Sequence, residues 1–70
     1  MYMAITPYRT DDFEKEVKEI YRFLTSGGFT DCGGFQGDVC DEGEWNSLWA
    51  FETDAEAQRF VREWAAVEFA

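Results

Sequence analysis

The spacing of apolar side chains predicts a strand and then a helix in the first part of the chain. Residues 2–8 are rich in β-forming side chains, but strands tolerate proline only at an edge or an end, so we expect the strand to finish near Thr6, before Pro7. Apolar side chains then recur with the period of a helix that has one face toward a core. This stripe consists of Phe13, Val17, Ile20 and Leu24, with Tyr21 beside them.

Capping signals mark both ends of this helix. Thr10 and Asp11 are N-cap candidates, and Asp11 and Glu14 have the spacing of a capping box, in which each side chain accepts a hydrogen bond from a backbone N–H. Gly27 and Gly28 are expected to end the helix, because glycine readily adopts the left-handed conformation that follows a helix C-terminus.

A β-hairpin is predicted next. Residues 29–35 include adjacent glycines and predict a loop or a bulged strand start. Apolar and polar residues alternate over 35–40, an acidic turn occupies 41–44, and an aromatic-rich strand follows over 45–51. On this second strand one face holds Trp45, Ser47, Trp49 and Phe51, and the other holds Asn46, Leu48 and Ala50. Both faces carry apolar area, so one should pack on helices and the other is either covered or a binding surface.

A second helix is predicted from Thr53 to near the end of the chain. Thr53 and Glu56 form a second capping box, and Asp54 places a carboxylate in the first turn, where the helix dipole favours negative charge. The apolar face consists of Ala57, Phe60, Val61, Trp64 and Val67, and the side chains expected to point away are Arg59, Arg62 and Glu63.

The element order is therefore strand, helix, strand, strand, helix, which predicts an α+β fold. We expect a single domain over residues 1–70, with a small antiparallel or mixed sheet and two helices packed on one of its faces. Residues 66–70 could instead form a further strand. A length of 70 residues is near the lower limit for one hydrophobic core, but an aromatic content of 19% supplies enough apolar surface to fold.

The charge is concentrated in one stretch of the sequence. The formal net charge is -9, and residues 23–58 contain none of the basic residues. The acidic residues of this stretch are Asp31, Asp38, Asp41, Glu42, Glu44, Glu52, Asp54 and Glu56. The rest of the chain is nearly neutral, so the acidic stretch carries almost the whole net charge.

This charge excludes some partner classes and favours others. Nucleic acid and anionic lipid would be repelled, so neither direct nucleic-acid binding nor a membrane partner is expected, whereas a protein with a basic surface would be attracted. No apolar run approaches the roughly 20 residues needed to span a bilayer, and residues 1–9 lack the features of a secretory signal. A cytoplasmic location is therefore expected.

Candidate chemistry is sparse. The chain has no histidine, and its lysines, Lys15 and Lys18, are expected on a solvated helix face, so we predict no enzyme activity and no cofactor. Cys32 and Cys40 are read as two reduced, partly buried thiols, with a disulfide as the alternative. The acidic turn lacks the ligand spacing of a calcium loop, and the glycines of 33–37 lack the context of a phosphate-binding loop, so no metal or nucleotide site is predicted.

Two interpretations of the acidic stretch remain open. Net charge keeps a small protein soluble, and this role alone could account for the carboxylates. Alternatively, they form a patch spaced like backbone phosphates that binds a groove built for nucleic acid, with an exposed tryptophan, Trp45 or Trp49, as an apolar anchor. The predicted partner-binding residues are Asp31, Asp38, Asp41, Glu42, Glu44, Trp45, Glu52, Asp54 and Glu56.

In size, acidity and lack of catalytic residues the chain resembles the small phage-encoded anti-CRISPR proteins, several families of which are acidic mimics of DNA. The resemblance covers the general character of the chain and no particular residue, so no family site is carried over. It implies an inhibitor that occupies a basic nucleic-acid-binding surface of a CRISPR–Cas subunit in the cytoplasm of the host cell.

The alternative function is a small oligomeric α+β module for ligand binding or regulation, whose acids only confer solubility. In that case the open sheet face would form a homodimer, whereas the inhibitor could act as a monomer. An enzyme with an acidic site ranks third.

Overall fold

The computed structural model describes residues 1–29 and 32–68. It shows strand β1 over Tyr2–Pro7, one residue past the expected end. Pro7 is accommodated because β1 lies at an edge of the sheet. The N–H of Tyr8 donates to the carbonyl of Trp45 at 3.0 Å. Since successive residues of a strand point their N–H groups in opposite directions, position 7 faces away from the sheet and loses no pairing hydrogen bond to proline.

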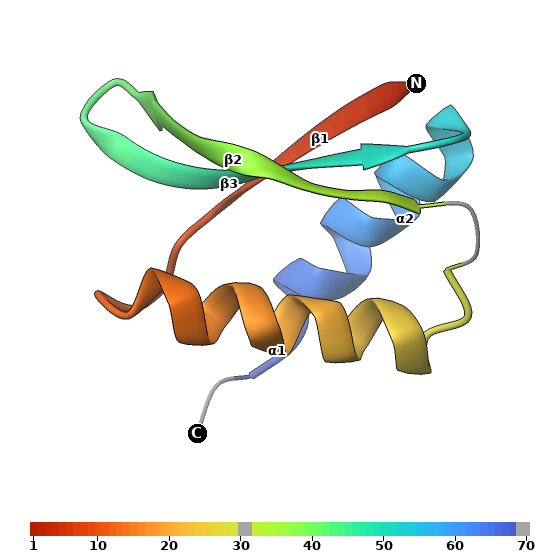
Figure 1. Ribbon diagram of the computed structural model, residues 1–70, viewed down its shortest axis with the longest axis horizontal. Coiled ribbons are helices and arrows are strands. Elements are labelled where there is room, and N and C mark those ends of the chain that lie inside the picture. The colour runs from red at the N-terminus through yellow and green to blue at the C-terminus, as the bar shows by residue number, and fades with distance from the viewer. Residues whose placement is uncertain (30–31, 69–70) are drawn as a thin grey trace.

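The sheet has three antiparallel strands in the order β1-β3-β2, with β2 at Cys32–Asp41 and β3 at Glu44–Phe51. Helices α1 (Phe13–Ser26) and α2 (Asp54–Ala65) both cover the same face of this sheet (Figure 1). The α+β prediction is confirmed, and the sheet is antiparallel throughout. Residues 66–68 form no strand, and 69–70 lie outside the described residues.

The β2–β3 hairpin forms where the sequence placed it. Glu42 and Gly43 have φ values of 51° and 80°, the backbone of a two-residue turn whose two residues are both left-handed. The start of β2 is irregular, with register shifts between Cys32 and Gly34 and between Phe35 and Gly37, as the glycines predicted.

The caps match the sequence prediction with one exception. The N-cap of α1 is Asp12, whose side chain accepts from the N–H of Lys15, so the predicted caps Thr10 and Asp11 and the capping box of Asp11 with Glu14 are wrong. The helix begins at Phe13, and the carbonyl of Asp12 accepts its first backbone hydrogen bond from the N–H of Glu16 at 3.1 Å, which makes Asp12 the capping residue. Thr53 caps α2 as predicted, accepting from the N–H of Glu56 at 3.1 Å. Gly28, with φ of 73°, follows the C-cap of α1.

The core lies between the sheet and the helices and is largely aromatic. Its buried members are Ala4, Ile20, Leu24, Phe29, Trp49, Phe51, Ala57, Phe60 and Trp64. Phe60 lies at its centre, with ring centroids of Trp49 and Phe51 at 6.1 and 5.1 Å. Val61, predicted to share the apolar face of α2, is 41% exposed.

Arg59 does not point away from the core, contrary to the prediction. Its guanidinium lies 4.1 Å from the ring centroid of Phe29 and donates to the carbonyl of Gly27 at 2.6 Å. The cation therefore caps the C-terminal end of α1, where partial negative charge accumulates. Helical spacing alone could not show this, because the contact depends on how α1 and α2 cross.

Glu16 is the least expected member of the interior, with only 2% of its surface exposed. Its carboxylate accepts from the backbone N–H groups of Arg9 and Thr10 at 3.0 Å and from the Thr10 hydroxyl at 3.1 Å. These donors satisfy a buried charge and tie the β1–α1 connection to the helix.

Candidate partner-binding surface

The tip of the β2–β3 hairpin concentrates negative charge in a way that the fold itself does not require. Asp41 and Glu44 are directly opposite each other across the two strands, and Glu42 lies in the turn between them. None of these three carboxylates forms a hydrogen bond or ion pair with another residue that the structure describes. Like charges opposite each other in a ladder destabilise it.

The backbone of the turn is a second feature that lowers the stability of the fold. Glu42 adopts a left-handed backbone that an L-residue with a Cβ occupies at a cost of roughly 1 to 2 kcal/mol, and asparagine or glycine is the usual choice there. The left-handed backbone and the added negative charge of Glu42 both disfavour this turn. Such a residue points to a role outside the fold.

An aromatic cluster lies beside the hairpin. The rings of Tyr8 and Phe13 stack with centroids 3.9 Å apart and planes 7° from parallel, and Trp45 lies 6.3 Å from Phe13. Trp45 is 48% exposed, whereas Trp49, on the same strand face, is fully buried. Trp45 is therefore the exposed tryptophan, since Trp64 is buried as well.

Tyr8 links this cluster to the acids. Its hydroxyl donates a hydrogen bond to a carboxylate oxygen of Asp38 on β2. Burial raises the pKa of Tyr8 well above its usual value of 10.0, and the hydrogen bond and negative charge of Asp38 raise it further, with a smaller contribution from Glu16. Tyr8 therefore remains a neutral phenol at physiological pH, and its donated hydrogen bond fixes the position of Asp38.

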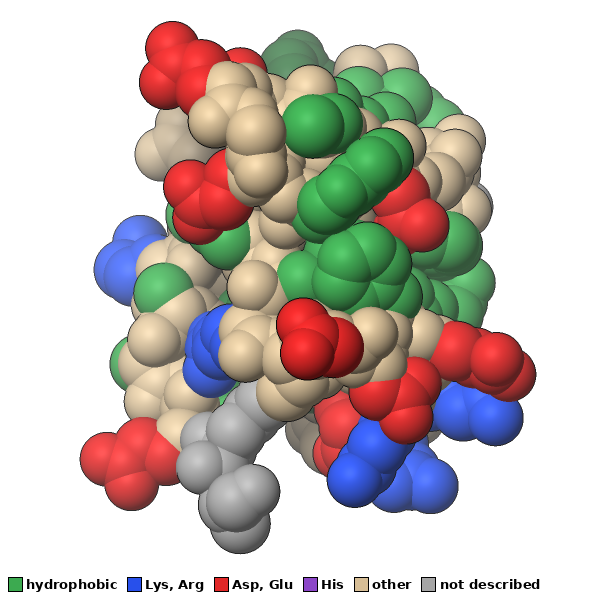
Figure 2. Space-filling view, turned by 90° about the vertical axis from the view of Figure 1, so that its left-hand side faces the viewer, with side chains coloured by type: hydrophobic (Ala, Val, Ile, Leu, Met, Phe, Trp, Pro, Cys, Tyr) green, Lys and Arg blue, Asp and Glu red, His purple; other side chains and the backbone are tan. Residues whose placement is uncertain are grey.

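We call this region the acidic aromatic end; it consists of Tyr8, Phe13, Asp38, Asp41, Glu42, Glu44 and Trp45. Figure 2 looks at this end of the molecule and shows hydrophobic side chains in its centre and upper part with carboxylates around them. The lysine and arginine side chains in that view lie on the left and in the lower half. The surface combines an apolar centre with a charged rim, the arrangement common to protein interfaces.

The other predicted acids are not brought to this end. Glu52, Asp54 and Glu56 lie beyond the far end of β3, whose length of eight residues separates them from Glu44 by roughly 23 Å. Asp54 accepts from Gln58 at 2.8 Å, and Glu56 completes the cap at Thr53, so both serve the first turn of α2. Asp31 lies outside the described residues.

Several arginine and lysine side chains form hydrogen bonds or ion pairs within the fold. Arg9 donates to the carbonyls of Trp64 and Val67 at the end of α2, and Lys18 and Arg22 pair with acids of α1 at 3.6 and 3.0 Å. Arg59 pairs with Glu63 at 2.8 Å. These ion pairs therefore neutralise acids of the helices and leave the acids of the hairpin tip without a cation among the described residues.

The cysteine prediction needs one correction. Cys40 has a free thiol, but it is exposed and not partly buried, because it lies near the hairpin tip beyond the helices. The thiol of Cys32 lies outside what the structure describes.

Across the described ranges, no group of three or more potential ligand residues is arranged to hold a metal ion. Within the same ranges no helix combines the length and apolarity needed to cross a bilayer.

Two residues of the surface were missed from the sequence. Phe13 was placed in the core stripe of α1, yet it is only half-buried, because the helix begins there and the sheet ends. Tyr8 was given no role, because the first strand was expected to finish near Thr6. An aromatic residue just before a helix and another at its first position were the available signal for a cluster.

The fold and surface define a small α+β protein whose three-stranded antiparallel sheet is backed by two helices, with an acidic aromatic surface at the hairpin end. Comparisons with protein-family models, with curated proteins and with solved structures found no match to this chain. Functional inference therefore depends on the residues themselves.

Proposed function

We propose that this protein is a non-enzymatic interaction protein that binds a positively charged surface of another protein through its acidic aromatic end. Trp45 and Phe13 would contact the partner directly, and the carboxylates of Asp41, Glu42 and Glu44 would surround that contact. Half-exposed aromatic side chains provide binding energy, whereas rim charges mainly provide attraction at a distance and orientation.

The observation that carries this proposal is the unpaired charge of the hairpin tip. Asp41 and Glu44 repel each other across the ladder, and Glu42 occupies a backbone conformation that disfavours glutamate. Solubility alone does not require charge at these particular positions, since exposed sites on the helices would serve as well. A basic partner would relieve the repulsion on binding.

The chemistry of the partner follows from the surface. A groove that binds nucleic acid carries the lysine and arginine side chains that a row of carboxylates attracts. Given the general resemblance to anti-CRISPR proteins, a CRISPR–Cas effector complex is the first purified partner to test, with displacement of its bound nucleic acid as the measurement.

The test compares two charge-matched variants in a quantitative pull-down from a bacterial lysate. One carries Asp41→Asn, Glu42→Gln and Glu44→Gln; the control neutralises the exposed or half-exposed acids Glu14, Glu19 and Glu68 as glutamine. The association rate constant for the captured partner should fall about tenfold in the first variant and little in the control.

Two further outcomes decide the proposal. Trp45→Ala should raise the dissociation rate constant without removing the salt dependence of association, because it deletes a short-range contact. If the hairpin triple variant binds with unchanged affinity at low salt, the acids serve solubility and the proposed function is wrong.

A further inference from the structure

The outer edge of β1 is open for pairing. Because the N–H of Tyr8 faces β3, the backbone groups of Ala4 and Thr6 face β3 as well, and those of Met3 and Ile5 face outward. No strand pairs with this edge among the residues that the structure describes. Two N–H groups and two carbonyls thus lie in a row along it.

This edge lacks most of the features that prevent strands from pairing. Edge strands are commonly protected by lysine, by bulges or by proline. The other edge, β2, has two register shifts and several glycines, whereas β1 has regular pairing, no charged residue and proline only at its last position. The side chains of Met3 and Ile5 lie on the face of the sheet that the helices do not cover. Both are apolar, and they are 55% and 41% exposed.

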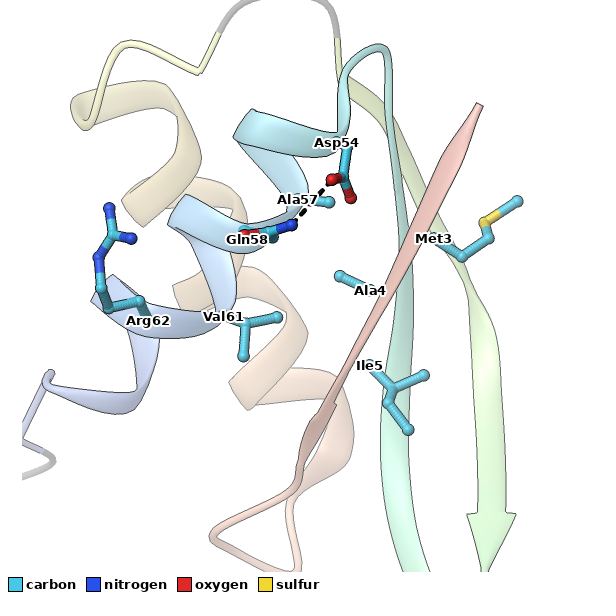
Figure 3. Close-up of a pocket in the computed structure, with 8 residues that line it drawn as sticks. All are labelled: Met3, Ala4, Ile5, Asp54, Ala57, Gln58, Val61 and Arg62. Carbon is cyan, nitrogen blue, oxygen red and sulfur yellow. Dashed lines mark hydrogen bonds between the residues drawn. The ribbon is translucent and has the colours of Figure 1, made fainter.

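A groove runs along the same edge between β1 and α2. Its volume is about 530 Å³, and it is lined by Met3, Ala4 and Ile5 on one side and by α2 residues between Asp54 and Arg62 on the other. Figure 3 shows Asp54 beside the Met3 end of the strand, Val61 on the part of α2 that lies nearer to Ile5, and the Arg62 side chain extending away from the strand. On the strand, the Ala4 side chain points toward α2, whereas the Met3 and Ile5 side chains point away from it (Figure 3). Along the helix, Asp54 and Arg62 give the groove one charge of each sign.

The pattern in this groove is self-complementary. Asp54 and Arg62 are each four residues from Gln58, so on α2 the three side chains lie along one line with opposite charges at its ends. Met3 and Ile5 are each one residue from Ala4 on the strand. A two-fold axis passing near Ala4 and Gln58 would therefore place Met3 opposite Ile5 of a second copy and Asp54 opposite its Arg62.

We propose that two copies of this protein associate through their β1 edges to form one continuous six-stranded antiparallel sheet. In this arrangement Met3 and Ile5 of each copy exchange N–H···O=C hydrogen bonds with Ile5 and Met3 of the other. The two α2 helices lie antiparallel beneath the junction, where Val61 becomes covered. The register centred on Ala4 uses both outward N–H groups and leaves Pro7, which has none, at the rim.

Charge distribution favours this edge over the other surfaces for contact between copies. The chain carries a net charge of -9, but the groove contains Asp54 and Arg62 and is balanced. The hairpin tip joins β3 and β2 beyond the end of β1 that is opposite Met3, so the two acidic aromatic ends lie at diagonally opposite corners of the joint sheet. This surface is separate from the proposed partner site, and either can be wrong without the other.

The test uses sedimentation equilibrium of the full chain up to millimolar concentration. Asp54→Arg alone and Arg62→Asp alone each turn two attractive pairs into two repulsive ones and should weaken self-association about tenfold or more. An equimolar mixture of these variants restores both attractive pairs and should recover the dimer. Arg22→Asp, on the exposed face of α1, is the charge-matched control and should dimerise like the unmodified protein.

Ile5→Pro provides a second, independent arm. It removes an outward N–H without touching a β1–β3 hydrogen bond and should give a monomer with an unchanged circular dichroism spectrum. The proposal is overturned if the unmodified protein stays monomeric at millimolar concentration. It is equally overturned if the mixture of charge variants stays monomeric, or if a dimer persists in Ile5→Pro and in both charge variants.

Discussion

Replacing Glu16 with glutamine tests whether a buried carboxylate holds the β1–α1 connection in place. Glutamine has nearly the same shape, so the change alters charge and hydrogen bonding while conserving volume. The carboxylate accepts from two backbone N–H groups, those of Arg9 and Thr10, and from one hydroxyl. In the variant the carbonyl can replace the oxygen that accepts from all three donors, while the NH₂ faces the N–H of Arg9 at the position of the other oxygen. The Arg9 N–H therefore loses one of its two contacts, and the remaining hydrogen bonds go to a neutral acceptor.

The magnitude follows from the number and kind of these bonds. A hydrogen bond to a charged group contributes about 1.5 to 3 kcal/mol, and the neutral carbonyl of glutamine keeps part of it. We therefore expect a loss of about 2 to 3 kcal/mol in the free energy of unfolding. A domain of 70 residues has a total of roughly 3.5 to 10 kcal/mol, so the effect is a large share of its stability.

Urea unfolding followed by tryptophan fluorescence measures this loss, with Glu14→Gln as the control. Glu14 is exposed on the same helix and forms a 3.6 Å ion pair with Lys18, so its replacement should cost about 0.5 kcal/mol or less. A Glu16→Gln protein as stable as the Glu14→Gln protein would refute the reasoning and show that water satisfies the connection equally well.

Other predictions concern the core and the acidic aromatic end. Trp64→Ala should cost about 3 to 5 kcal/mol in chemical unfolding, because the buried ring packs 5.2 Å from Phe23; a melting temperature close to that of the parent would contradict this. Glu42→Asn should stabilise the fold by about 1 kcal/mol, since asparagine tolerates the left-handed turn, while weakening partner binding. Tyr8 has a raised pKa when folded, so unfolding releases a proton above pH 10.0 and stability should fall as pH rises past that value. This fall should be smaller in Tyr8→Phe, and equal pH profiles would show that Tyr8 is not responsible.

Local signals in the sequence were sufficient for the secondary structure. The cap at Thr53, the glycines after α1 and the turn at Glu42–Gly43 each depend on residues a few positions apart. They can therefore be predicted from the sequence without any tertiary contact. The same locality predicted the irregular start of β2. These elements, in this order, required an α+β fold.

The order of the strands was beyond such signals. Placing β3 between β1 and β2 depends on which strand edges meet after α1 crosses the sheet, and no local pattern encodes that meeting. Local patterns also could not show which charged side chains are buried. Glu16 resembles the exposed glutamates of α1 in sequence, yet it is buried because the β1–α1 connection folds over it.

The candidate surface was decided in the same way. Acids that form one stretch in the sequence separate to opposite ends of β3, because an extended strand places distance between residues that are close along the chain. Trp45 and Trp49 share a strand face, so the alternation of side chains along the strand could not show which of them would be an exposed anchor. Only the position of the helices, which cover Trp49 and stop short of Trp45, made one of them core and left the other exposed.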